Sequence, residues 1–285
     1  MTTLPHAAPS RWAVLADELA KLPAFFRRDI RIALSYRLGF VTDWAALLIQ
    51  AFTFSFIGRL VNPAALPTYG GHPVSYMEFA IIGIALGGFV SLALGRVSSG
   101  IRQEQVIGTL ESLLVTPTST KTIQLGAVLY DLVFIPIRTA VFLLVTALLF
   151  GLNFHASGIA PAILVLVALL PFVWGIGVAT AGLVLTFRRG TMIVGLGAAV
   201  LTLLSGSLFP LDLLPHWLEI IASFNPLAIA IQSMRETLLG GEGLSNALIA
   251  TAELIPFALA SLVAGFWVFR LSLQRERRLG TIGLY

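Results

Sequence analysis

Few residues in this sequence could do chemistry, and most of them are isolated. The chain has no cysteine, which excludes disulfides and thiolate chemistry, and its four histidines lie far apart, so no two have the spacing of metal ligands. A loop that cradles nucleotide phosphates needs a lysine after a glycine, and neither Lys21 nor Lys121 follows one. We therefore expect no metal site, no catalytic residue and no nucleotide site on this chain.

Two charged residues lie deep inside one apolar stretch. Asp131 and Arg138 are seven residues apart and so share roughly one face of a helix. An unpaired charge costs about 2.5–3.5 kcal/mol at the centre of a bilayer. The two residues are candidates for a polar point on a transport path. A structural ion pair, with each other or with Glu253, or a side chain that snorkels to the interface explains them equally well.

These residues belong to a chain whose surface must lie mainly in lipid. Apolar residues make up 57% of the chain and charged residues 11%, whereas a soluble domain carries about 25% charged residues. A helix crosses the hydrocarbon core with about 20 apolar residues. Six stretches meet this length, namely residues 38–60, 76–98, 122–150, 161–187, 190–209 and 249–270. The sequence predicts an all-α integral membrane protein with six transmembrane helices.

Residues 1–37 read as an amphipathic helix rather than a span. They combine many charges with apolar residues at three- and four-residue spacing, which predicts a helix in the membrane interface, broken at Pro23. An amphipathic helix packed on a partner is the alternative. We expect two domains, this interfacial helix and a transmembrane domain over residues 38–285.

A second segment, between the fifth and sixth spans, is apolar but interrupted. Three prolines, Pro210, Pro215 and Pro226, cut it into pieces too short to cross a membrane. The segment therefore predicts short re-entrant helices that enter the outer interface and return.

The positions of the basic residues predict the orientation of the chain. If both termini lie on one side, then all but three of the 18 lysines and arginines fall on that side, and the loops 61–75 and 151–160 contain none. Lysine and arginine are retained on the cytoplasmic side of a membrane. We expect both termini in the cytoplasm. The basic excess then reflects topology and anionic lipid, not nucleic acid.

The connection between the second and third spans predicts a short helix with an apolar face. Gly108 can end one helix and Thr109 can cap the next. Glu111 then lies in the first turn, where the helix dipole favours an acid, and Pro117 ends the helix. Its apolar face is formed by Leu110, Leu113 and Leu114. Such a face exposes leucine to water unless a partner covers it.

This segment resembles the ABC-2 type permeases, the membrane subunits of ATP-binding-cassette exporters. The matching residues are Glu104-x-x-x-Gly108-Thr109-Leu110-Glu111-x-Leu113-Leu114-x-Thr116-Pro117. A second matching stretch reads Ser205-Gly206-x-Leu208-Phe209-Pro210, then Leu214-Pro215-x-Trp217-Leu218, Asn225-Pro226-Leu227 and Arg235. Val106 and Ile107 depart from the family, in which charged residues often precede the glycine, so the partner surface is less predictable.

The resemblance assigns roles to both stretches. In that family the first forms cytoplasmic coupling helices that dock into the ATPase subunit, and the second forms re-entrant helices near the extracellular gate. The residues it implies at the ATPase contact are Glu104, Gly108, Thr109, Leu110, Glu111, Leu113, Leu114, Thr116 and Pro117, with a smaller contact at Arg188 and Arg189. Those it implies near the gate are Phe209, Pro210, Pro215, Trp217, Asn225 and Pro226.

The resemblance also implies a function. It predicts an exporter permease in the inner membrane of a prokaryote, paired as a homodimer or with a similar permease, that moves an amphipathic, drug-like, lipid or lipid-linked substrate outward. Two copies of a separate ATPase subunit would bind ATP and Mg, so this chain needs no cofactor. An ion-coupled secondary transporter or channel without an ATPase is the alternative. A membrane enzyme acting on lipid would need a catalytic His/Asp/Glu cluster, which the sequence does not show.

Overall fold

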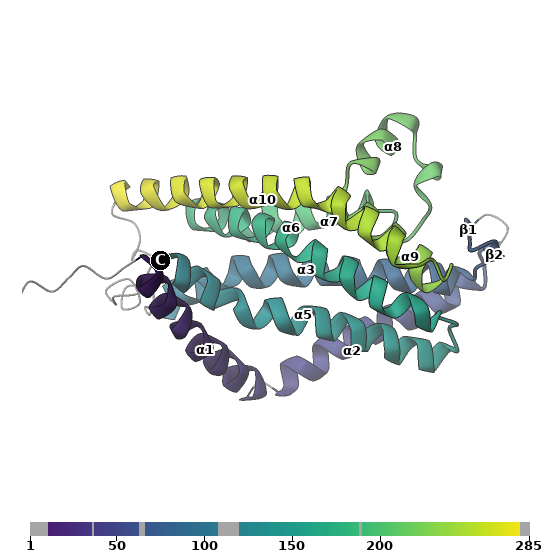
Figure 1. Ribbon diagram of the computed structural model, residues 1–285, viewed down its shortest axis with the longest axis horizontal. Coiled ribbons are helices and arrows are strands. Elements are labelled where there is room, and N and C mark those ends of the chain that lie inside the picture. The colour runs from purple at the N-terminus through teal and green to yellow at the C-terminus, as the bar shows by residue number, and fades with distance from the viewer. Residues whose placement is uncertain (1–10, 36, 63–65, 108–119, 188–189, 280–285) are drawn as a thin grey trace, which may run out of the picture.

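The computed structural model describes residues 11–35, 37–62, 66–107, 120–187 and 190–279. Nearly all of them are helical, and the longest helices run along one axis (Figure 1). The helices are α1 (Arg11–Ser35), α2 (Arg37–Gly58), α3 (Tyr76–Ile107), α5 (Thr120–Phe150), α6 (Ile159–Thr186), α7 (Gly190–Leu203), α8 (His216–Ser223), α9 (Pro226–Leu238) and α10 (Leu244–Leu279), with short 3-10 helices η2 (Ala156–Gly158) and η3 (Leu211–Leu213). Strands β1 (Thr68–Tyr69) and β2 (His72–Pro73) pair antiparallel as a small hairpin.

Four helical stretches in the described part are long and apolar enough to cross a membrane. They are Tyr76–Gly95, Leu129–Phe150, Ala156–Val184 and Leu244–Arg275. Two shorter apolar helices, Trp44–Gly58 and Met192–Leu203, fall within the first and fifth predicted spans. A multi-pass helical membrane protein is therefore confirmed, whereas the count of six spans stays a prediction.

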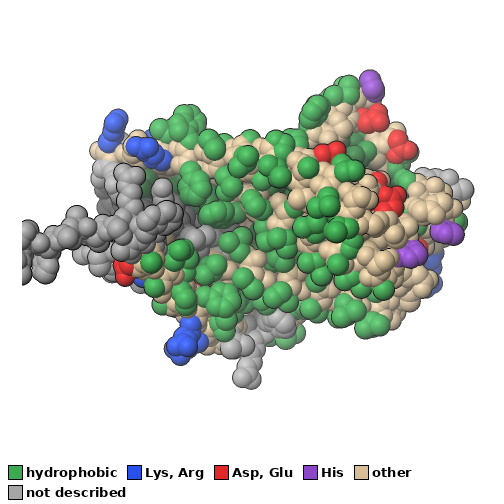
Figure 2. Space-filling view, in the orientation of Figure 1, with side chains coloured by type: hydrophobic (Ala, Val, Ile, Leu, Met, Phe, Trp, Pro, Cys, Tyr) green, Lys and Arg blue, Asp and Glu red, His purple; other side chains and the backbone are tan. Residues whose placement is uncertain are grey.

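The surface of the helices is apolar along most of their length. Leu148, Met192 and Val263 are 77%, 72% and 71% exposed, and many other large apolar side chains are also exposed. Hydrophobic side chains cover the middle of the molecule, and charged side chains gather toward its two ends (Figure 2). Water would disfavour so large an apolar surface. Lipid removes that cost, which agrees with the composition.

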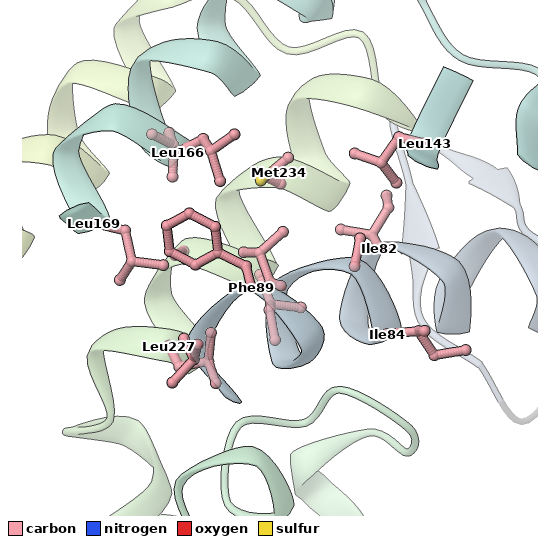
Figure 3. Packing of buried hydrophobic residues seen from close by; sticks show 14 of the residues in the cluster. Ile82, Ile84, Phe89, Leu143, Leu166, Leu169, Leu227 and Met234 are labelled. Atoms are coloured by element: carbon pink, nitrogen blue, oxygen red, sulfur yellow. The ribbon is translucent and has the colours of Figure 1, made fainter. Parts of the chain in front are cut away.

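Helix α3 lies at the centre of the helices. Its apolar stretch is 78% buried, whereas that of α10 is 22% buried. Phe89 of α3 lies in the same buried cluster as Leu166 and Leu169 of α6 and Leu227 and Met234 of α9 (Figure 3). A displacement of α3 would therefore disturb its packing on both α6 and α9.

Helices α6 and α10 form the most extensive helix–helix contact. Their backbones approach closely because glycines face each other. A Cβ at Gly265 would overlap the carbonyl oxygen of Gly175, and one at Gly182 would lie 2.9 Å from the Cα of Phe269. Small residues of this kind are the usual means by which helices associate in a membrane.

The predicted break of α1 at Pro23 is wrong. Pro23 lies inside a continuous helix. An internal proline removes one backbone hydrogen bond and can bend a helix without ending it. Packing on the start of α5 supports α1, because Phe25 lies against Gly126 and the rings of Phe26 and Tyr130 are 6.2 Å apart. The helix is thus packed on a helix of its own chain.

Helix α7 ends earlier than the sequence predicts. The fifth span was expected to continue to residue 209, but the helix stops at Leu203. The hydroxyls of Ser205 and Ser207 both donate to the carbonyl of Thr202, at 2.6 and 3.0 Å, which competes with backbone hydrogen bonding. Gly206 then takes a positive φ of 66°, a conformation that glycine adopts without strain.

Candidate functional site

The segment expected to bind the ATPase lies mostly outside the described residues. This applies to residues 108–117 and to Arg188 and Arg189. Glu104 lies in the last turns of α3. The helices that flank both gaps are described: α3 ends and α5 begins at the end of the molecule where α10 also ends (Figure 1), and Gly190 of α7 donates to the carbonyl of Phe187 at 2.9 Å. The contact itself stays a prediction.

The opposite end, which we call the hairpin end, carries the β-hairpin, α8 and α9 (Figure 1). Arg235 of α9 is buried there and is 3% exposed. Its Nε and Nη2 donate to the carbonyl of Phe79 at 3.1 and 2.9 Å, and Nη2 also donates to the carbonyls of Gly206 and Ser207 at 3.0 and 3.1 Å. One side chain thus joins α9, α3 and the turn after α7.

The guanidinium of Arg235 stays protonated although it is buried. It lies 3.5 Å from the centroid of the Phe79 ring, a cation–π contact. Burial lowers the pKa of Arg235 to about 10, and nearby Tyr69 opposes that shift. The side chain therefore remains a cation at neutral pH, stabilised by carbonyl dipoles and an aromatic face.

Other side chains hold the same turn and the end of α7. The amide of Asn225 donates to the carbonyl of Leu201 at 2.8 Å, and the hydroxyl of Tyr76 donates to the carbonyl of Leu208 at 2.9 Å. On α3, a Cβ at Gly83 would overlap the carbonyl oxygen of Ser207. We call Tyr76, Asn225, Arg235 and residues 204–208 the α9 node. The node thus links α3, α9 and the turn after α7 through hydrogen bonds.

The structure separates the residues predicted near the gate into two groups. Asn225 caps α9 by accepting from the backbone N–H of Leu227 at 3.0 Å, and Pro226 follows at the first helical position, a favoured pairing. Pro210 is buried close by and lines a cavity with Arg235, and Phe209 is half-buried. In contrast, Pro215 and Trp217 lie on exposed α8 and its N-cap. Only the first group belongs to the α9 node or borders it.

Sequence reasoning named Arg235 within the resemblance but gave it no role. The signal was present, since Arg235 is the sole basic residue of an apolar helix that begins with a capping Asn-Pro pair. Its partners could not be inferred, because Phe79 lies 156 positions away in the chain.

A cavity of about 230 Å³ borders the α9 node. Tyr69, Gln232 and Arg235 line it, together with Asp212 of the 3-10 turn before α8. The hydroxyl of Tyr69 donates to the side-chain oxygen of Gln232 at 3.2 Å. Burial raises the pKa of Tyr69, although Arg235 acts in the opposite direction, so the phenol stays protonated at neutral pH.

A second cavity, of about 330 Å³, lies between α2, α3 and α5 and contains Arg138. Asp131 instead borders a narrow apolar pocket of about 20 Å³ with Leu132 and Trp174. The two charged residues predicted as one polar path therefore lie on different cavities. Seven residues place them roughly 10 Å apart along α5, and Phe89 and Ile135 border both cavities.

Comparison with known proteins agrees with the resemblance found in the sequence. Residues 23–239 match the family model described as ABC-2 type transporter. Over 183 residues the chain is 30% identical to the linearmycin resistance permease protein LnrN of Bacillus subtilis (strain 168), and the alignment covers 64% of this chain. It covers 47% of LnrN, so the chain matches about half the length of this relative. Because the family model matches most of the chain, this protein belongs to the ABC-2 type transporter family.

Proposed function

We propose that the chain is the permease subunit of an ABC exporter, which forms the translocation pathway and works with a separate ATPase subunit. The observation that carries this proposal is the family match over residues 23–239. The apolar, lipid-suited surface of the long helices supports it. Residues 104–117, with Arg188 and Arg189, form the contact with the ATPase.

The distribution of charge supports a cytoplasmic position for that contact. Helix α1 contains Arg27 and Arg31, and the last turns of α10 contain Arg275. Lysine and arginine side chains are seen toward the end at which α3 and α10 finish (Figures 1 and 2). Lysine and arginine accumulate on the cytoplasmic side. ATP would close the ATPase and displace the start of α5 and the end of α3, and the central, buried α3 would transmit the displacement as a rigid-body movement.

The partners and cargo follow from the same assignment. Two ATPase subunits act on two permeases, either two copies of this chain or one copy with a similar permease, in the inner membrane of a prokaryote. The cargo is an amphipathic, drug-like, lipid or lipid-linked molecule. The name of LnrN describes a resistance permease, which favours a drug-like or lipid-like cargo.

The test compares two charge reversals in the chain co-expressed with its cognate ATPase. Glu111→Lys alters the predicted contact, whereas Glu219→Lys alters α8 at the hairpin end. We expect Glu111→Lys to lose co-purification and permease-stimulated ATP turnover, and Glu219→Lys to keep both. Unchanged binding and turnover in Glu111→Lys would show that the coupling assignment is wrong. Transport in liposomes on an ion gradient, with no ATPase present, would favour a secondary transporter instead.

A further inference from the structure

The outward face of α10 changes its chemical character toward the end of the helix. Helix α10 packs on α6 and α9, and the residues that it buries include Leu254, Ala258, Phe269 and Ser272. The opposite face is exposed. One exposed row can be followed along it at spacings of three and four residues, through Leu259, Val263, Trp267, Arg270, Gln274 and Arg278. This row, which we call the α10 row, is apolar as far as Trp267 and polar from Arg270 onward.

The change from apolar to basic marks a boundary of the membrane. Residues 254–269 carry no charge, and as a helix they span about 24 Å, most of a hydrocarbon core that is about 30 Å thick. Trp267 is 63% exposed at the end of this stretch. Tryptophan is enriched where the hydrocarbon meets the headgroups. The α10 row therefore leaves the hydrocarbon between Trp267 and Arg270.

Beyond this boundary the row presents two arginines whose charges are not neutralised within the described part of the chain. Arg270 and Arg278 are exposed, and none of the ion pairs between described residues involves either of them. Lysine or arginine side chains project outward near the end of α10 (Figures 1 and 2). The two arginines are two helical turns apart, roughly 12 Å along the axis, and Gln274 lies one turn from each.

The position of these arginines favours a lipid headgroup as their partner. They continue the face of α10 that is turned to lipid, and phosphates lie just outside the hydrocarbon on that same face. Arginine pairs with a phosphate through parallel hydrogen bonds. Its apolar stem can lie along neighbouring apolar side chains, here Trp267 and the exposed Leu271. The segments proposed to contact the ATPase, residues 104–117 with Arg188 and Arg189, belong to other connections of the chain.

We propose that Arg270, Gln274 and Arg278 bind the headgroup of an anionic phospholipid, whose acyl chains lie against Trp267 and Leu271. Neighbouring members of this group are one turn apart, so two side chains can reach one phosphate, and the amide of Gln274 adds a neutral donor. A zwitterionic headgroup binds less well, because its own cation competes for the phosphate. The proposal assigns lipid binding to one row of one helix, and it does not depend on the exporter function.

The experiment measures which lipid lies beside the α10 row and needs no ATPase. Because the chain has no cysteine, Leu271→Cys gives a single attachment point for a fluorophore at an exposed position next to Arg270. The purified full chain is placed in phosphatidylcholine nanodiscs. These contain a small fraction of phosphatidylglycerol or phosphatidylcholine that carries a doxyl quencher near the headgroup. The two quenchers differ only in their headgroups. A matched reporter, Leu244→Cys, labels an exposed position at the opposite end of α10.

We expect the label at position 271 to prefer the anionic lipid by about fivefold to thirtyfold, as one or two arginines at a charged membrane surface imply. The label at position 244 should show no such preference. Arg270→Gln combined with Arg278→Gln should abolish the preference at position 271, and the corresponding pair of lysine substitutions should keep most of it. Arg59→Gln is the control, because Arg59 is an exposed arginine just after α2, over the ring of Phe56. It should change nothing at position 271.

Equal quenching by the two lipids at position 271 overturns the proposal, as does an unchanged preference when both arginines are glutamine. If that double variant does not fold, a preference that persists at about 1 M salt overturns it, because salt screens exposed charges. Absence of quenching by either lipid also overturns it, since a second copy or the ATPase would then cover this face.

The outcome is separable from that of the proposed function. A lipid preference in a chain that binds no ATPase leaves the α10 row standing and removes the exporter. An ATPase-coupled chain without the preference does the reverse.

Discussion

Replacement of Arg235 by methionine tests whether one side chain holds the hairpin end together. Methionine keeps most of the apolar volume of the stem but has no donor. The carbonyl oxygens of Phe79, Gly206 and Ser207 would lose four hydrogen bonds in a buried site. The cation–π contact with the Phe79 ring would also be lost.

The expected loss of stability follows from these contacts. Each buried acceptor left without a partner costs about 1–3 kcal/mol. Removal of the guanidinium also removes its own desolvation cost, which offsets part of the loss. We therefore expect the free energy of unfolding to fall by about 2–4 kcal/mol, which is the cost of leaving the carbonyls of Gly206 and Ser207 unpaired less this desolvation cost. Arg235→Lys should fall in between, because it keeps the charge but not the fork of donors.

The assay is equilibrium unfolding in mixed micelles with increasing dodecyl sulfate, together with limited proteolysis of the turn at residues 204–208. The turn should be cut faster in Arg235→Met, because its carbonyls anchor it to α3 and α9. Arg59→Met is the control, since Arg59 is exposed. A loss below about 1 kcal/mol with unchanged cleavage would contradict the role given to the α9 node.

Two further predictions concern packing and pH. Gly83→Ala should destabilise the chain, because a Cβ there overlaps the backbone of Ser207, whereas Gly197→Ala on α7 meets nothing within 4 Å and should be neutral or stabilising in the same unfolding assay. Burial, with smaller contributions from Glu242 and Glu253, raises the pKa of Glu236. The folded chain thus keeps the proton of Glu236 up to a higher pH than the unfolded chain does. The free energy of unfolding therefore falls as the pH rises from 4.5 through the raised pKa. Glu236→Gln should remove that slope in unfolding measured from acid to neutral pH, and an unchanged slope would refute the reasoning.

The sequence alone determined the solvent and the class of the protein. So few charges cannot cover a water-facing surface, and long apolar runs must become helices, because lipid offers no partner for a free backbone group. The family could also be recognised from the sequence. Residues 104–117 and 205–235 are each continuous in the chain, so the spacing within each motif can be seen without knowledge of the fold.

Tertiary structure decided where the helices end and which polar residues meet. Apolar periodicity cannot show that α7 stops at Leu203, because the side chains that bind the following carbonyls come from α3 and α9. Nor can it show that Pro23 is accommodated by packing on α5. Asp131 and Arg138 share a helical face but lie on different cavities, because the neighbouring helices change along α5. Local pattern sets which side of a helix is apolar, whereas its neighbours at each depth depend on contacts between distant segments.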